Sequence, residues 1–184
     1  MAEQKKTRIL LKNVRLSYAN IFEPKAMNEG DDPKYSVSLI IDKNDENNIK
    51  KIKQAIENAK LNGKSEKFGG KVPANLRTPL RDGDTDREDD DAYNNAYFLN
   101  ANSKQAPEVI DQRKLPATDA DVYSGCYAHV TVNFYPYAVS GNKGIAVGLG
   151  NIMKAKDGER LSGGASAESD FADIDAEDDD DLFD

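Results

Sequence analysis

The sequence predicts a mainly β domain that closes into a small barrel, with one α-helix and a separate acidic segment. Three observations support this fold class. Apolar and polar residues alternate along several segments, with the period of two expected of half-buried strands. Only one segment has apolar residues at helical spacing, so the strand-helix alternation of a parallel sheet is missing. Acidic residues also concentrate in the last twenty or so positions, where strand patterning stops.

The first two strands are predicted before the helix, and the remaining strands follow it. In the segment 34–42, Tyr35, Val37 and Leu39 alternate with serines, which places the apolar side chains on one face. The longest patterned run, 121–137, is the strongest strand in the chain. The predicted strands cover 7–18, 34–42, 96–102, 121–137 and 144–155, and the segment 106–115 holds either another short strand or a loop.

The helix is predicted immediately after the second strand. Asp42 or Asn44 is suited to cap its N-terminus, and Asn62-Gly63 is a typical stop signal. Its apolar face consists of Ile49, Ile52, Ile56 and Ala59, at spacings of three and four.

The predicted order of elements favours a five-stranded OB-fold barrel over residues 1–161. Residues 64–92 form a long insertion with an irregular pattern, which holds basic residues and then the acidic run from Asp82 to Asp91. A flexible Gly/Ser linker follows at 162–169, and 170–184 is predicted to be a disordered acidic interaction tail.

The net charge of −8 hides an uneven distribution. Ten acidic residues and no basic one lie between Ser166 and Asp184, so residues 1–165 carry 25 basic and 23 acidic residues. Seven of those 23 acids fall in the run from Asp82 to Asp91. The remaining body is therefore basic, which is the sign expected of a domain that binds a polyanion.

The composition also excludes several classes of protein. No apolar run is long enough to span a bilayer, and we expect a soluble protein of a reducing cytoplasm. A single cysteine, Cys126, excludes an internal disulfide or a cysteine-based zinc site, and a single histidine, His129, leaves little His-dependent chemistry. We expect no enzyme activity, no cofactor and no metal site.

The strand over 125–137 carries the main candidate binding surface. One face is apolar, from Cys126 to Phe134, whereas the opposite face alternates aromatic and small polar residues. Bases stack on flat aromatic rings with little regard to sequence, and polar neighbours can bond to phosphates or base edges. Exposed tyrosines are also common in strands that pack on a loop or a partner. The candidate residues on this face are Tyr127, His129, Asn133, Tyr135 and Tyr137.

Basic residues supply a second candidate element. Lysines lie on the polar faces of the predicted helix, and further basic residues occur in the insertion next to Gly69-Gly70. A flexible basic loop of this kind can close over a single strand of nucleic acid. A solvated helix face explains the helix lysines equally well. The candidate contacts to a nucleic-acid backbone are Arg15, Lys71, Arg77, Arg81 and Lys104, and Phe98 is a further candidate aromatic.

The acidic tail carries an apolar pair behind its densest run of charge. Acids keep such a segment extended, and an apolar pair can plug a pocket rimmed by basic residues. The acids also resemble a phosphate chain, so the tail can compete with a nucleic acid for a basic groove. The candidate partner-binding residues are Asp178, Asp179, Asp180, Asp181, Leu182 and Phe183.

The chain resembles phage single-stranded-DNA-binding proteins of the OB-fold type, a family long catalogued only as a domain of unknown function. It is also similar to the single-strand-binding proteins of short-tailed coliphages. The resemblance implies coating of single-stranded DNA during replication and recombination. It also implies tail contacts with replication proteins such as DNA polymerase or helicase, and a homodimer in many members. The segments that carry it are KNVRLSYANIF, AYFLNANS, VYSGCYAHVTVNFYPY, KGIAVGLGNIMKAKDGERL and the acidic tail.

Other functions remain open from the residues alone. The acids from Asp82 to Asp91 resemble a nuclease metal cluster, but they sit in an apparently irregular segment without an accompanying catalytic Lys or His motif. An acidic DNA mimic that binds another protein is a second alternative. An RNA-binding OB module is a third, because discrimination through the 2′-hydroxyl depends on geometry.

Overall fold

The strands of this protein form one continuous sheet, with its main helix packed against one side. The structure, a computed structural model, describes residues 5–26 and 28–161. Its strands are β1 (Arg8–Lys25), β2 (Lys34–Asp42), β3 (Arg81–Asp82), β4 (Ala96–Ser103), β5 (Val109–Ile110), β6 (Tyr127–Val139) and β7 (Asn142–Lys156). Its helices are α1 (Glu46–Glu66), α2 (Gly83–Asp86) and a 3-10 turn, η1 (Asp91–Tyr93).

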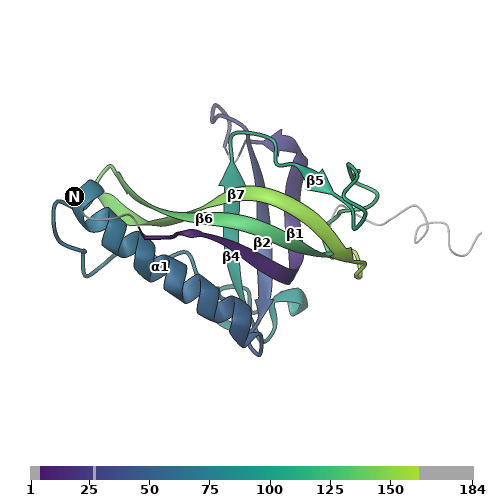
Figure 1. Ribbon diagram of the computed structural model, residues 1–184, viewed down its shortest axis with the longest axis horizontal. Helices are drawn as coiled ribbons and strands as arrows, with labels where there is room; N and C mark the ends of the chain where they lie inside the picture. Colours follow the sequence, from purple (N-terminus) through teal and green to yellow (C-terminus); the bar gives the residue numbers. More distant parts are fainter. Residues whose placement is uncertain (1–4, 27, 162–184) are drawn as a thin grey trace, which may run out of the picture.

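The sheet closes on itself. The strand order is β3-β4-β2-β1-β6-β7-β5, and a further parallel pairing joins Asn102 of β4 to Gly148 of β7. The five long strands therefore form a closed barrel, which Figure 1 shows with α1 running along its lower side. The predicted mainly β, five-stranded OB-fold barrel with one main helix is confirmed.

The alternation read from the sequence matches the barrel's core. On β6, Ala128, Val130, Val132 and Phe134 are at most 1% exposed, and their outward neighbours are exposed or half-buried. The inward residues of β1, β2 and β7 complete one apolar cluster inside the barrel. The largest predicted strands therefore have the predicted facing, and the closed sheet leaves few free strand edges.

The helix is longer than predicted, and its cap is a different residue. Asp45 caps it by accepting a hydrogen bond from the Asn48 amide. Gly63 does not stop the helix, which continues to Glu66. A Cβ at Gly63 would lie 2.6 Å from the Phe68 ring and from Pro136, so glycine is needed there for close packing against β6.

The insertion at 64–92 is more ordered than predicted. It contains the last turn of α1, then β3, α2 and most of η1, whereas 67–80 hold no helix or named strand, so the segment is irregular only in its first part. Asp82 caps α2, and Asp90 caps η1, because these carboxylates accept hydrogen bonds from the first free amides. Part of the acidic run thus serves local folding.

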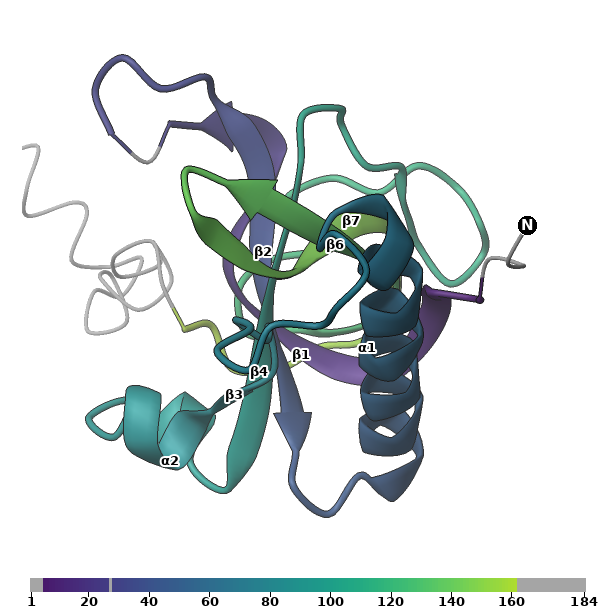
Figure 2. The same ribbon diagram turned by 90° about the vertical axis from the view of Figure 1, so that its left-hand side faces the viewer.

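A second apolar cluster holds this insertion against the outside of the barrel. Tyr93 and Phe98 meet edge to face with ring centres 5.0 Å apart, over Ile40 of β2, and the Tyr93 hydroxyl donates to Ser38. Leu161 packs against the same cluster. Figure 2 shows the result, with α1 and α2 on opposite sides of the barrel.

Two kinds of feature are absent from residues 5–26 and 28–161. No helix there is long and apolar enough to cross a membrane. No group of three or more His, Cys, Asp or Glu side chains in that part of the chain is arranged to hold a metal ion.

Candidate nucleic-acid interface

The candidate residues of β6 share one face, but its two ends have different surroundings. Four of the candidates alternate with side chains that point into the core: Tyr127, His129, Asn133 and Tyr135. Tyr137 lies beyond them, between half-buried Pro136 and exposed Ala138. The strand rises about 3.3 Å per residue, so Tyr127 and Tyr137 are roughly 33 Å apart along it. One base-binding site cannot include both ends.

Tyr135 and Tyr137 stand at the open end of this row. Tyr135 is 39% exposed, and its ring lies against the backbone of Gly148, where an added Cβ would be 3.6 Å away. The hydroxyl of Tyr137 lies over Gly144 in the same manner, and a Cβ there would be only 2.7 Å from it. Arg77 is beside them, because its carbonyl accepts a hydrogen bond from the Ile145 amide at 2.8 Å.

Tyr127, at the other end, is covered by cations. The Lys156 ammonium lies 4.6 Å from its ring centre, and the Arg15 guanidinium lies 5.8 Å away. Arg15 also donates from Nε to the Gly125 carbonyl at 3.1 Å and from Nη2 to the Glu159 carbonyl at 2.9 Å. Its side chain therefore fastens the segment after β7 to the barrel.

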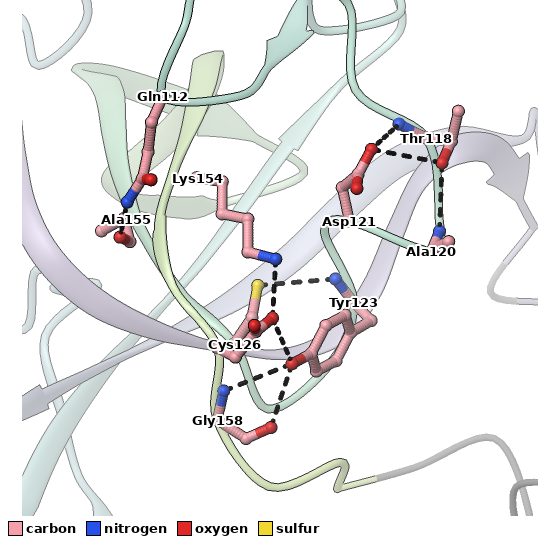
Figure 3. Close-up of polar contacts among 10 residues, drawn as sticks. Gln112, Thr118, Ala120, Asp121, Tyr123, Cys126, Lys154, Ala155 and Gly158 are labelled. Carbon is pink, nitrogen blue, oxygen red and sulfur yellow. Dashed lines mark hydrogen bonds and ion pairs between the residues drawn. The ribbon is translucent and has the colours of Figure 1, made fainter. Parts of the chain in front are cut away.

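A network of polar contacts reinforces this end of the barrel (Figure 3). The Tyr123 hydroxyl donates to Asp157, and the Lys154 ammonium reaches the same carboxylate at 2.6 Å. These two contacts lower the pKa of Asp157, and the ion pair raises the pKa of Lys154. Burial is the main cause of the raised pKa of Tyr123. The network is structural, since each of its polar groups is already paired.

His129 is also engaged by the protein itself. Its Nδ1 accepts a hydrogen bond from the Asn13 amide at 3.2 Å, at an irregularity in β1 where Asn13 has a φ of 55°. A ring held in this way fixes the local backbone of β1. Together, Arg15, Tyr127 and His129 form what we term the anchored end of β6.

A row of small polar residues runs around the outside of the barrel from the open end. Directly paired residues of neighbouring strands share a face, and successive pairings here link five residues across five strands. We term this row the polar belt; it consists of Asn20 on β1, Ser36 on β2, Asn102 on β4, Gly148 on β7 and Asn133 on β6. The Asn20 amide donates to the Ser36 hydroxyl at 3.4 Å, in agreement with this shared facing. The belt is rich in hydrogen-bonding groups.

A cavity of about 490 Å³ lies at the β1–β2–β4 end of the belt. Tyr18, 48% exposed, lines it, and the Arg87 guanidinium lies 5.2 Å above the centre of the Tyr18 ring. The same guanidinium is 5.6 Å from Tyr93 and 5.8 Å from Phe98. An aromatic ring and a planar cation thus face the cavity together, a combination on which bases stack well.

Sequence reasoning missed Tyr18 and Arg87. Counting by twos places Tyr18 on the same face as Val14 and Leu16, but this expectation is wrong, because Tyr18 has a φ of 48° that interrupts the alternation and its side chain is exposed. Arg87 was the single base of an acidic run, and its isolation there was the available signal.

Lysines surround the outer rim of this cavity. Lys25 and Lys34 face each other as partners on β1 and β2, and both line the cavity. Lys104 shares a neighbouring hollow with them and with Asp31 and Asp32. The predicted candidate Lys104 therefore lies in the hollow next to the cavity, where two carboxylates offset part of the positive charge.

The other basic candidates are dispersed. Lys71 lies exposed in the segment between α1 and β3, away from the cavity lining. Arg81 is exposed and lies 3.8 Å from Asp86, an ion pair of little strength at the surface. Phe98 is 1% exposed beneath Arg87, so the prediction that it contacts DNA is wrong: its ring builds the second core cluster.

Two acids of the insertion form ion pairs with the same lysine. Lys43 lies 2.9 Å from Asp82 and 2.7 Å from Asp84, and Asp84 also accepts a hydrogen bond from the Asn95 amide. The Lys43 contact is the main cause of the lowered pKa of Asp84, and the pKa of Lys43 is raised in return. These acids tie the insertion to the end of β2.

Residues 7–183 match the family model of the single-stranded-DNA-binding protein of Enterobacter phage Enc34. The chain belongs to this Enc34 family. A solved structure of the Enc34 protein in complex with single-stranded DNA has a TM-score of 0.74 and 26% identity to this chain, covering 85% of this chain and 90% of that one. The resemblance read from the sequence is confirmed.

Two further proteins are similar to this chain over most of their length. Putative protein p50 of Acyrthosiphon pisum secondary endosymbiont phage 1 is 34% identical over 171 residues, which are 87% of this chain and 89% of that protein. The single-stranded-DNA-binding protein gp2.5 of bacteriophage T7 has a TM-score of 0.56 at 16% identity, covering 94% of this chain and 97% of that one, which shows a shared fold.

The candidate tail residues, Asp178 to Asp181 with Leu182 and Phe183, lie outside the described residues, as does the linker at 162–169. The Enc34 family model nevertheless extends over nearly all of this segment.

Proposed function

We propose that this chain binds single-stranded DNA across the polar belt, from the Tyr18–Arg87 cavity to Tyr135 and Tyr137. The observation that carries the proposal is the position of the belt between two exposed tyrosines. A strand laid along it finds stacking rings at both ends and hydrogen-bonding groups between them. Membership of the Enc34 family supports the same ligand.

The arrangement favours binding without sequence preference. Rings stack on any base, and Asn, Ser and backbone groups bond to sugars and phosphates of every nucleotide. Lys25, Lys34, Lys104 and Arg77 lie near the two ends of the belt, where they can neutralise phosphates. Duplex DNA presents no free base faces and so loses the stacking contribution.

In its biological setting, such a protein coats single strands during phage replication and recombination in the host cytoplasm. The acidic tail competes with DNA for the basic surface and recruits replication proteins such as a DNA polymerase or helicase. Charge supports the tail's role: residues 166–184 carry ten acids, whereas the body bears an excess of bases.

Titration of labelled oligo(dT), oligo(U) and a duplex of equal length tests the ligand class. We expect tight binding to oligo(dT) and much weaker binding to duplex. Equal binding to duplex would contradict the stacking platform, and preference for oligo(U) would make the protein an RNA binder. Removal of residues 166–184 should raise the affinity for oligo(dT) at low salt; a lowered affinity would contradict competition by the tail.

A further inference from the structure

The two ends of the proposed DNA path carry opposite charges. At the Tyr18 end, the run 82–91 contains seven acidic residues and one basic residue, Arg87, whose guanidinium lies over the Tyr18 ring. At the Tyr137 end, the segment 60–77 contains five basic residues and one acidic residue. The phosphates of a DNA strand attract only the basic segment, so the acidic segment needs a different explanation.

Two carboxylates of the acidic run are available to another molecule. Two other acids of the run are already paired with Lys43. Glu88 and Asp89 directly follow Arg87 and are exposed, and in the part of the chain that the structure describes no ion pair or hydrogen bond engages their side chains. Their backbone is held in a turn, because the Asp90 amide donates to the Arg87 carbonyl at 3.0 Å. The turn therefore presents two carboxylates next to the Tyr18–Arg87 cavity.

The basic segment lies at the opposite end of the path because α1 ends there. An added Cβ at Gly63 would lie 2.6 Å from Pro136, the residue between the two tyrosines of the open end. Lys64 follows this glycine in the last turn of α1, Lys67 is the C-cap, and Glu66 stands between them. Both lysines are exposed, and neither is paired with a carboxylate among residues 5–26 and 28–161. Figure 2 shows α1 and α2, which precedes the acidic turn, on opposite sides of the barrel.

We propose that successive copies of this chain on one DNA strand contact each other head to tail. In this contact, Glu88 and Asp89 of one copy lie against Lys64 and Lys67 of the next. The proposed DNA path runs from one of these pairs to the other, so a strand that leaves one copy brings opposite charges together at the junction with the next copy. The contact joins two different surfaces, so it can repeat along the strand without closing into a two-fold dimer. This inference rests on the course of the DNA path in the proposed function.

Such a contact is effective only on DNA. Exposed ion pairs contribute little individually, and salt screens them, so free copies should stay apart. A shared strand holds two neighbours at a high effective concentration, at which a weak contact adds to the affinity. We therefore expect a site beside an occupied one to bind this protein on the order of 10-fold more tightly than an isolated site.

Titration of the full chain against oligo(dT) of one, two and three times the length that a single copy occupies tests the contact. The second and third sites should each gain the same factor over an isolated site, and the factor should fall as the salt concentration rises. Equal affinity of all sites overturns the proposal. A gain that stops at two copies also contradicts it, because such a gain indicates a closed dimer.

Charge reversal identifies the two surfaces. Reversal of the acidic side (Glu88→Lys with Asp89→Lys) or of the basic side (Lys64→Glu with Lys67→Glu) should remove the gain, because like charges then meet at every junction. An equimolar mixture of the two variants should restore most of it, since a mixed pair again brings opposite charges together. A mixture that binds without the gain overturns the proposal.

The matched control reverses two other lysines of the same helix. Lys50→Glu with Lys53→Glu changes the net charge by the same amount at the same spacing, but near the start of α1. This variant should keep the gain, and an equal loss would indicate an effect of net charge and contradict the contact. Binding to single-site oligo(dT) over duplex is measured in every sample and reports on the proposed function. Intact single-site selectivity without a gain would contradict only the neighbour contact, whereas lost selectivity in the wild type would contradict the proposed function.

Discussion

The two ends of β6 have the same sequence pattern and different environments. At the open end, the Tyr135 ring lies on a glycine backbone and remains 39% exposed. At the anchored end, Tyr127 is flanked by Arg15 and Lys156, and Arg15 is bonded to two backbone carbonyls. An aromatic side chain becomes a platform for a ligand only where its neighbours leave a face free, and periodicity alone does not report on those neighbours.

The largest expected difference is between two matched tyrosine substitutions. Tyr135→Ala should weaken oligo(dT) binding by ~1–3 kcal/mol, or about 5- to 150-fold, because one stacked base loses its ring. Tyr127→Ala removes the same side chain from the same strand and should change the affinity far less. Fluorescence titration of both variants measures this, with circular dichroism to check folding. Equal losses would erase the proposed distinction between the two ends.

At the anchored end, substitution of Arg15 should affect folding stability rather than DNA binding. Arg15→Gln removes the two charged hydrogen bonds to Gly125 and Glu159, which should lower the free energy of unfolding by ~1–3 kcal/mol. The affinity of the folded protein for oligo(dT) should stay close to that of the wild type. Urea denaturation and titration at low temperature separate the two effects. Unchanged stability together with weakened DNA binding would contradict this and indicate that Arg15 contacts DNA.

The salt dependence of DNA binding should differ between a lysine at the cavity and a lysine at the anchored end. Each phosphate that the protein neutralises contributes about −0.7 to the slope of log K against log salt for a single strand. Lys34→Gln, at the cavity, should reduce the slope by roughly that amount. Lys156→Gln, over Tyr127, should leave the slope as it is, and titrations at four or five salt concentrations would show whether the two variants differ.

The smallest expected effect is a pH-dependent one at the anchored end. The pKa of Asp157 is lowered from 3.8 by Lys154 and Tyr123, so its stabilisation is present above that value and is lost as pH falls through the lower folded pKa. The pKa of Lys154 is raised from 10.5, so its share is lost only as pH rises through the higher folded value. Asp157→Asn should therefore lower the melting temperature slightly between about pH 4 and 10 and have no effect below that window. A variant whose deficit persists in strong acid would argue against the ion pair as its cause.

Much of the fold could be predicted from the sequence because strand and helix periods are local. The strand over 34–42 has the predicted bounds, and the inward residues of β6 are the predicted ones. What the sequence could not supply were contacts between distant segments. The sequence predicts Phe98 as a surface aromatic, whereas Tyr93 and Arg87 cover its ring in the structure. It also predicts Gly63 as the end of the helix, whereas this glycine allows Pro136 and Phe68 to pack closely.

The candidate site was predicted in part for the same reason. Alternation gave the outward face of β6, but the polar belt depends on pairings between five strands, which no local pattern reveals. From the sequence, the acidic run belongs to a segment with an irregular pattern. In the structure its carboxylates cap short helices and pair with Lys43, and its single arginine lies over Tyr18.

A crystal structure of the full chain with oligo(dT) would show whether the DNA strand follows the polar belt. We expect bases stacked on Tyr18 and Tyr135, with the sugar-phosphate chain crossing Ser36, Asn102 and Gly148. A strand that instead runs over Tyr127 and His129, and leaves the polar belt bare, would contradict it.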